Sequence, residues 1–204
     1  MKLIIGLGNP GDKYESTRHN VGFLIVEHLL KDLEPVKNSN WSEEKKLKSQ
    51  IYSLEYDGKG KEAERVILAK PETFMNNSGM AISLLANYYK VSPDDIWIVH
   101  DELDLPLGSM KIRLGGSAAG HHGLESIIES LGTDKFWRFR MGIGETKGRD
   151  EAYKHPFNAT EFVLKPFSGS DKSKARAMFK RGSKSLQTAL EKGIESAQNQ
   201  FNTK

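Results

Sequence analysis

The sequence contains no cysteine and no apolar run that approaches the roughly 20 residues a membrane span requires. Without cysteine the chain can form neither a disulfide framework nor a thiolate zinc site, so a metal would need histidine and carboxylate ligands. The N-terminal apolar run, Leu3 to Ile5, is followed by turn residues where a signal peptide would continue. We therefore expect a cytoplasmic protein that does not associate with a membrane.

The length of 204 residues suits a single domain with a full hydrophobic core, and we expect residues 1–204 to form one domain. The formal net charge is only +3, but six basic residues and no acidic one lie between Lys172 and Lys184. A solvated helix face is the favoured interpretation of such a run taken alone. Contact with a polyanion is the alternative, because local charge density matters more for partners than total charge.

The spacing of apolar residues divides the chain into short strands and amphipathic helices. Strands are predicted at Lys2–Ile5, Ile51–Tyr56, Arg65–Lys70, Ile96–Val99, Met110–Leu114 and Phe136–Gly144. Helices are predicted at Val21–Leu33, from Thr73 as N-cap to about Tyr89, at His122–Leu131 and from about Asp171 to Gln200. Loops are predicted at Lys37–Lys48 and Lys147–Ala159.

Strands that alternate with helices predict an α/β fold, built as a single domain on a mixed, mostly parallel, twisted β-sheet with helices on both faces. In such folds, ligand sites gather at the carboxyl ends of the strands. Asn9 follows an apolar strand and Asp101 closes another. We expect both side chains at that edge of the sheet.

The segment from Val99 to Gly123 combines acidic residues, a glycine-rich loop and two histidines. An ionised Asp101 at the end of an apolar strand needs a partner, and His19, just before the first helix, can supply an imidazole N–H. A His–Asp pair forms a general base, since the carboxylate fixes the tautomer and stabilises the imidazolium. With no cysteine and no GxSxG elbow, this base would activate water, which indicates hydrolysis. A lone histidine at a helix start can also be only a structural hydrogen bonder.

Two glycine-rich motifs suggest different ligands. GLGNPG after the first strand matches the GxGxxG dinucleotide pattern, which would indicate a nucleotide-binding oxidoreductase. However, Pro10, Gly11 and Asp12 delay the required helix, and no acidic residue ends a second strand about 20 residues on, so a tight turn that presents Asn9 is favoured. The second motif, GGSAAG, can bring backbone N–H groups close to a phosphate.

Asn76, His121 and His122 lie at predicted helix starts, where each side chain can serve either the local structure or a ligand. Asn76 can cap a helix or turn its amide toward a substrate carbonyl. His121 and His122 could ligate a metal, but adjacent residues at a helix start point about 100° apart, and no HExxH spacing accompanies them. We therefore expect no metal.

A group of basic residues lies on or beside the predicted strands near the glycine-rich loop: Lys111, Arg113, Arg138, Arg140, Lys147 and Arg149. This grouping suggests a polyanion site more strongly than a charge run on a helix does. A phosphate-bearing ligand could lie across these strands.

Five segments, in the same order and at family-like spacing, resemble bacterial peptidyl-tRNA hydrolase: GLGNPGDKYESTRHNVGF, KPETFMNNSG, VHDELDLPLGSMKIRLGGSAAGHHGLESII, FWRFRMGIG and FVLKPF. The resemblance covers nearly the whole chain from Met1 to Ser168. It implies hydrolysis of the ester that joins a peptide to the 3′ end of tRNA, with peptidyl-tRNA as partner and neither a metal nor an organic cofactor. The mostly polar composition leads us to expect a monomer.

Carried onto this sequence, the resemblance makes His19 the general base and Asp101 the residue that orients it and raises its basicity. Asn9 and Asn76 would hold the substrate carbonyl and terminal ribose or position the water.

The resemblance also assigns residues around this pair. Tyr14 and Met75 would shape the cleft, and His121 matches the histidine of the family's GHNG motif. Arg113 and Arg140 fall where the family places basic residues that bind the tRNA 5′ phosphate. Arginine suits that role, because it offers a charge-assisted, multi-donor contact to phosphate.

His122 departs from the family pattern, which usually has asparagine at this position. Asparagine offers an acceptor and two donors, whereas neutral imidazole offers one of each in a fixed plane. We expect activity to survive with some loss, because the base and its partner are intact. The alternative is an RNA-binding relative that keeps the fold and the basic surface but has lost the chemistry, and the retained His19 and Asp101 argue against it.

Overall fold

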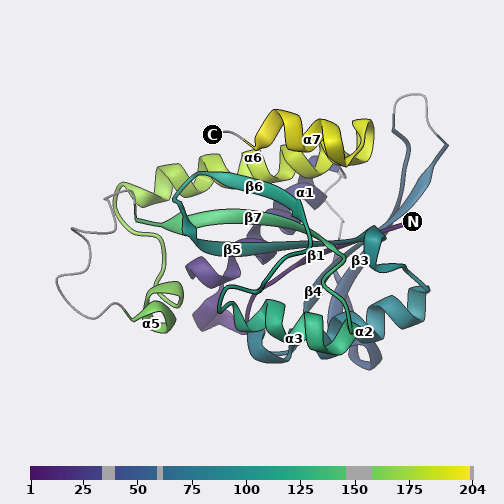
Figure 1. Cartoon of the computed structure of the whole chain (residues 1–204), viewed down its shortest axis with the longest axis horizontal. Helices are drawn as coiled ribbons and strands as arrows, with labels where there is room; N and C mark the ends of the chain where they lie inside the picture. Colours follow the sequence, from purple (N-terminus) through teal and green to yellow (C-terminus); the bar gives the residue numbers. More distant parts are fainter. Residues whose placement is uncertain (34–39, 59–61, 146–157, 203–204) are drawn as a thin grey trace.

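Seven strands form one sheet in the computed structural model, which describes residues 1–33, 40–58, 62–145 and 158–202. Their spatial order is β2-β3-β4-β1-β5-β7-β6 (Figure 1). The strands are β1 (Lys2–Gly6), β2 (Ser42–Glu44), β3 (Ser49–Tyr56), β4 (Glu64–Pro71), β5 (Ile96–Pro106), β6 (Met110–Leu114) and β7 (Trp137–Gly144).

The parallel part of this sheet is confined to its centre. β4, β1, β5 and β7 run parallel, whereas β2 and β3 on one side and β6 on the other are antiparallel to their neighbours. The predicted α/β fold and mixed sheet are confirmed, but the description as mostly parallel holds only for the four central strands. On the β2–β3–β4 side, the connections are too short for the crossover that a parallel pair requires.

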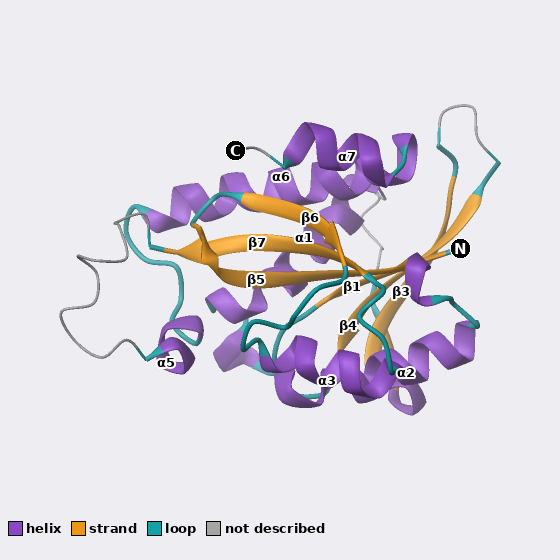
Figure 2. Ribbon diagram, viewed as in Figure 1, coloured by secondary structure: helices purple, strands orange, loops and turns teal. Residues whose placement is uncertain are grey.

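Helices cover both faces of the sheet, as the sequence predicts (Figure 2). α1 (Val21–Leu33), α6 (Asp171–Lys192) and α7 (Ile194–Phe201) bury their apolar residues in one core cluster. α2 (Ser78–Tyr89) and α3 (His122–Leu131) pack into a second cluster on the opposite face, and the short α5 spans Ala159–Val163. None of the helices in the described part of the chain has the length and apolar character needed to cross a bilayer.

The C-terminal helix differs from its predicted extent. It does not continue to Gln200 but ends at Lys192, and Gly193, with a φ of 90°, separates it from α7. A residue with a side chain would be strained at this φ, so the glycine permits the change of direction.

Two further predictions of local structure are wrong. Thr73 does not cap a helix, because the 3₁₀ turn η4 (Met75–Asn77) intervenes before α2. Within the predicted loop Lys37–Lys48, residues 42–47 form β2 and a 3₁₀ turn. Of the predicted loop Lys147–Ala159, residues 147–157 lie outside the described residues.

A close backbone contact at Gly22 positions the first helix. A Cβ added to Gly22 would lie 2.3 Å from both the Leu7 nitrogen and the Val99 oxygen, so the approach requires glycine. α1 therefore begins directly over the point where the pairing of β1 with β5 ends, at Gly6 and Val99. The 3₁₀ turn before it, η2 (Arg18–Asn20), lies beside Asp101 of β5. Asp101 is two residues beyond Val99, the last residue of β5 that pairs with β1.

Candidate active site

A cleft lies at the carboxyl ends of β1 and β5, where two cavities adjoin. The first has a volume of about 200 Å³ and is lined by His19, Asp101, Glu102, Leu103, Ala119, Gly120, His121, His122, Ala159, Thr160 and Val163. The second, of about 180 Å³, is lined by Asn9, His19, Met75, Asn76, His122, Thr160, Val163 and Leu164. Because four residues line both, the cavities are two parts of one cleft.

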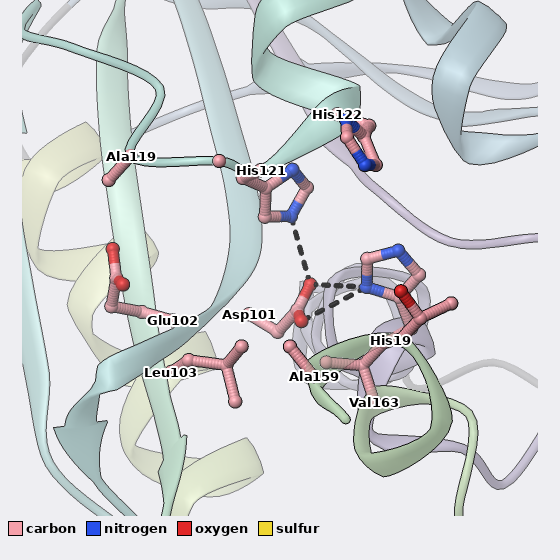
Figure 3. Close-up of a pocket in the computed structure, with 11 residues that line it drawn as sticks. His19, Asp101, Glu102, Leu103, Ala119, His121, His122, Ala159 and Val163 are labelled. Carbon is pink, nitrogen blue, oxygen red and sulfur yellow. Dashed lines mark hydrogen bonds and ion pairs between the residues drawn. The ribbon is translucent and has the colours of Figure 1, made fainter. Parts of the chain in front are cut away.

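His19 and Asp101 face each other in the first cavity (Figure 3). Nδ1 of His19 lies 3.0 Å from both carboxylate oxygens of Asp101. An ionised carboxylate only accepts hydrogen bonds, which assigns the proton of the neutral ring to Nδ1. The lone pair is therefore on Nε2, where a general base would use it. The structure brings these two residues together as the sequence predicts.

His121 makes a further hydrogen bond to the same carboxylate. Its Nε2 lies 3.0 Å from Oδ1 of Asp101, and its Nδ1 accepts a hydrogen bond from the backbone N–H of Leu124 at 3.3 Å. The second of these bonds is the N-cap of α3. An imidazole that donates from Nε2 and accepts at Nδ1 is neutral, so the start of α3 fixes the tautomer of His121.

The two imidazoles keep Asp101 ionised. Burial alone would raise the pKa of this carboxyl, but His19 and His121 outweigh burial and hold the pKa well below its usual range. The carboxylate acts on His19 in return. Burial lowers the pKa of His19, the charge and hydrogen bond of Asp101 raise it, and the net shift is upward. The pair is therefore a stronger base than a free imidazole.

His100 lies beside this network and is buried. Its Nδ1–H donates to the backbone carbonyl of Asp101 at 2.7 Å, and its ring packs edge-on against His121 with centroids 5.0 Å apart. Burial, reinforced by His121, lowers the pKa of His100 to about 3, so the ring is neutral. Its buried Nε2 has no partner among the described residues. The sequence prediction missed His100.

Three of these side chains also bring potential metal ligands together. A nitrogen of His19, a nitrogen of His121 and an oxygen of Asp101 lie within 4.8 Å of one another. The two nitrogens that face Asp101 carry protons in hydrogen bonds, whereas a metal ligand must present a lone pair. The arrangement therefore fits a hydrogen-bonded acid–base group better than a metal centre.

Asn9 and Asn76 lie in the second cavity. Oδ1 of Asn9 accepts a hydrogen bond from the backbone N–H of Met75 at 2.8 Å, and the Asn9 backbone N–H donates to Asn20 at 2.9 Å. The NH₂ group of Asn9 has no hydrogen bond to any described residue, which leaves it for a ligand. Asn77, not Asn76, is the N-cap of α2, so the capping interpretation of Asn76 is wrong.

His122 and Tyr14 lie farther from the acid–base pair. The His122 side chain is 73% exposed at the edge of both cavities, and its Nδ1 lies 2.8 Å from Oε2 of Glu125. Tyr14 packs edge-on against Phe74, with ring centroids 6.3 Å apart, and does not line either cavity.

The two arginines expected to bind phosphate project from the same face of the β6–β7 pair. In its register, Lys111 is opposite Arg140 and Arg113 is opposite Arg138. Arg113 is exposed and has no ion-pair partner among the described residues. Arg140 forms a salt bridge with Glu102 at 2.9 Å, so its charge is already compensated.

Arg138 has an internal role that the sequence prediction missed. It is buried, and its guanidinium donates to the carbonyls of Gly116 and Ser117 in the glycine-rich loop. The N–H of Gly116 donates to Asp134 at 2.8 Å. Arg138 is therefore not exposed for a polyanion, and the N–H of Gly116 is not free for a phosphate.

Arg18, next to His19 in the chain, fastens one side of the cleft. Its buried guanidinium donates to the carbonyls of Lys165 and Pro166, at 3.2 and 2.6 Å, and forms a salt bridge with Asp171 at 2.9 Å. These contacts tie η2 to the segment between α5 and α6.

α5, next to the segment that Arg18 contacts, supplies Thr160 and Val163 to the cleft. The sequence prediction missed both residues. The available signal is at the helix start, where Oδ1 of Asn158 accepts a hydrogen bond from the Glu161 N–H at 3.1 Å. Asparagine followed three residues later by glutamate is typical of a helix N-terminus.

Comparison with known proteins supplies the family. The model of the family described as Peptidyl-tRNA hydrolase matches residues 3–204. The chain belongs to the peptidyl-tRNA hydrolase family. A peptidyl-tRNA hydrolase of Aquifex aeolicus is 43% identical over 197 residues, which cover 97% of this chain and 94% of that protein. A peptidyl-tRNA hydrolase of Nocardia farcinica is 37% identical over 199 residues, which cover 98% and 95%.

Solved peptidyl-tRNA hydrolase structures have the same fold. The crystal structure of the enzyme from Acinetobacter baumannii superposes with a TM-score of 0.84 at 28% identity and covers 100% of this chain and 95% of that chain. A peptidyl-tRNA hydrolase in complex with N-propanol gives the same TM-score. The resemblance predicted from the sequence is confirmed, and this chain is a hydrolase of the peptidyl-tRNA hydrolase family.

Proposed function

We propose that the protein hydrolyses the ester bond between peptide and tRNA in peptidyl-tRNA released from ribosomes, which recycles the tRNA. The observation that carries this proposal is the contact of His19 with Asp101. Nδ1–H points to the carboxylate at 3.0 Å, so the lone pair of Nε2 is available in the cleft. This is the arrangement of a general base for water.

The proposed reaction needs no group beyond the residues of the cleft. Nε2 of His19 takes a proton from water, whose oxygen attacks the ester carbonyl, while Asp101 stabilises the imidazolium. The tetrahedral intermediate then loses the ribose oxygen, which takes the proton back from His19. The products are a peptide with a free carboxyl group and a tRNA with a free terminal hydroxyl.

Two amides are placed to stabilise the negative charge that develops on the carbonyl oxygen. The Asn9 NH₂ group has a fixed orientation, because Oδ1 is held by the Met75 N–H. Asn76 lines the same cavity and is exposed. Preorganised donors of this kind contribute about 10²- to 10³-fold to rate in acyl transfer. Met75 shapes this part of the cleft, and we propose that Tyr14 extends it toward solvent.

The remaining parts of the proposal concern the nucleic acid and the state of the protein. Arg113 provides an uncompensated charge for the tRNA 5′ phosphate, while Arg140 must exchange Glu102 for phosphate to contribute. His121 holds Asp101, and His122 contacts substrate at the edge of the cleft. We propose a metal-free, cofactor-free, monomeric, single-domain enzyme of the cytoplasm.

The test is release of N-acetyl-amino acid from N-acetyl-aminoacyl-tRNA by the purified protein in the presence of a chelator. His19→Ala should lower kcat/KM by about 10²- to 10⁴-fold, as expected for loss of a general base. His28→Ala is the matched control, because His28 also faces an aspartate, Asp32 at 3.8 Å, but lies on α1 away from the cleft.

Two outcomes would overturn the proposal. Wild-type protein that binds tRNA but releases no amino acid would instead be an RNA-binding relative without the chemistry. Full activity of His19→Ala, or loss of wild-type activity on chelation, would exclude the proposed base mechanism.

A further inference from the structure

A row of exposed basic side chains runs along α6. Lys172, Arg176, Lys180 and Lys184 recur every four residues and are all exposed. Residues four apart are neighbours on a helix surface, so these side chains form one stripe, about 18 Å long at 1.5 Å per residue. We call Lys172, Arg176, Lys180 and Lys184 the α6 basic stripe.

The charges of this stripe are uncompensated within the described part of the chain, where none of its members forms an ion pair. Four basic residues elsewhere are paired, in contrast: Lys2 with Asp95, Lys70 with Glu27, Arg140 with Glu102 and Lys165 with Glu161. Between Asp171 and Glu191, α6 itself carries no acidic residue. The stripe is thus a local excess of positive charge.

Helix stability does not explain this arrangement. Like charges four residues apart destabilise a helix by a few tenths of a kcal/mol per pair. Lys172 and Lys174 also lie in the first turn of α6, where the helix dipole disfavours positive charge. Arg181, by contrast, donates to the carbonyl of Phe201 at 3.0 Å and so contributes to packing of α7.

The stripe begins beside the cleft. Asp171, the residue before Lys172, forms the salt bridge with Arg18, and Arg18 precedes His19. From there α6 runs along the sheet away from the cleft (Figure 1). A polyanion whose end is in the cleft could therefore follow the stripe along its length.

We propose that the α6 basic stripe binds the phosphate backbone of the tRNA body while the esterified 3′ end lies in the cleft. The choice of tRNA as the ligand of this surface rests on the proposed function. RNA fits better than an acidic protein, because four exposed cations that recur every four residues along one side of α6 suit a regularly charged strand. Neutralised phosphates release counterions, which supplies affinity that depends on salt.

The experiment measures Kd for deacylated tRNA between 50 and 200 mM salt. The variant Lys172→Gln/Arg176→Gln/Lys180→Gln removes three charges from the stripe. The matched control, Lys31→Gln/Lys45→Gln/Lys46→Gln, removes three exposed charges from α1 and the turn before β3. We expect Kd of the stripe variant to rise about tenfold or more and the slope of log affinity against log salt to fall by about 2 to 3, at 0.7 to 0.9 per lost contact.

A second substrate separates the surface from the cleft. An N-acetyl-aminoacyl ester of the CCA trinucleotide reaches the cleft but not the stripe, so the stripe variant should hydrolyse it at the wild-type rate, which also reports correct folding. Equal tRNA affinity of the two triple variants, or an unchanged salt slope, would overturn the proposal. If the wild type cleaves neither ester but binds tRNA through the stripe, the proposed hydrolase function is wrong and the proposed tRNA-binding surface is supported.

Discussion

Oδ1 of Asp101 accepts a hydrogen bond from Nε2 of His121 at 3.0 Å, in addition to the bond from His19. The carboxylate is thus held from two sides, by a residue of η2 and by the N-cap of α3. Because the cap bond fixes His121, the orientation of Asp101 is coupled to the position of a helix. This rigidity keeps the proton of His19 on Nδ1 and the lone pair on Nε2.

Asp101→Asn should lower kcat/KM by about 10²- to 10⁴-fold. An asparagine can donate to Nδ1, which favours the tautomer with its proton on Nε2, where a base cannot use it. The pH dependence should also shift. In the wild type, Asp101 raises the pKa of His19 above 6.5, so activity rises with pH as the imidazole loses its proton above that value. Without the carboxylate, burial lowers the pKa, and the midpoint moves to lower pH.

The measurement is kcat/KM from pH 5 to 9 for wild type and variant. Asp95→Asn is the control. Asp95 pairs with Lys2 and directly precedes the first residue of β5, away from Asp101 and the cleft. A variant midpoint equal to or above that of the wild type would contradict the role assigned to Asp101.

The sequence was sufficient to predict the contact between His19 and Asp101 and most of the helices and strands. Asp101 follows the continuous apolar run Ile96–Val99 and His19 precedes an amphipathic helix, so the topology of a parallel sheet brings both to one edge. The predicted strand Ile96–Val99 is too short, however, because β5 continues past Asp101 to Pro106. The helices Val21–Leu33 and His122–Leu131 have the predicted bounds because their apolar periodicity is regular.

Contacts between distant segments could not be predicted in this way. Arg138 and Arg140 look alike in sequence, yet one is buried against the glycine-rich loop and the other is paired with Glu102. Whether a charge on a strand is compensated depends on its neighbouring strands. Similarly, the break at Gly193 is a tertiary effect, since the flanking helical periodicity does not show whether a glycine adopts a positive φ.

His122→Asn should raise kcat/KM severalfold. The imidazole is held by Glu125 at 2.8 Å and presents one ring nitrogen to the cleft, whereas an asparagine amide offers an acceptor and two donors. Glu125→Gln is the matched comparison, because it removes the carboxylate that contacts His122 and keeps the imidazole. Steady-state hydrolysis of N-acetyl-aminoacyl-tRNA distinguishes the two. No gain in His122→Asn would show that the histidine already serves the substrate as well as an amide does.

Arg18→Gln should raise KM more than it lowers kcat. The substitution removes the salt bridge to Asp171 and the donors to the carbonyls of Lys165 and Pro166, so α5 loses its anchor while His19 keeps Asp101. Because Thr160 and Val163 line the cleft, substrate binding is affected first.

Stability should fall as well in Arg18→Gln, by about 1–3 kcal/mol, which is typical when hydrogen bonds of a buried polar group are lost. Arg65→Gln is the control, since Arg65 is exposed, donates to the Ser53 hydroxyl and lies over the Tyr89 ring, far from the cleft. Urea unfolding and separate kcat and KM values test this prediction, and an unchanged KM would contradict it.

His100→Asn should make the fold less sensitive to acid. With a folded-state pKa of about 3 and an ordinary value of 6.5, His100 takes up a proton on unfolding between these values, so the folded state loses stability as pH falls through this window. At pH 4.5 the penalty is ~2–3 kcal/mol, at 1.36 kcal/mol per pH unit. Asparagine removes the titration, and its amide can still donate to the Asp101 carbonyl that Nδ1 of His100 contacts at 2.7 Å.

Urea unfolding at pH 7 and 4.5 should therefore show a smaller loss of stability for His100→Asn than for the wild type. His28→Asn, at a half-buried position of α1, should lose as much stability as the wild type. Equal losses of stability in all three proteins would contradict this prediction, because they would show that His100 takes up a proton as readily in the folded state as in the unfolded state.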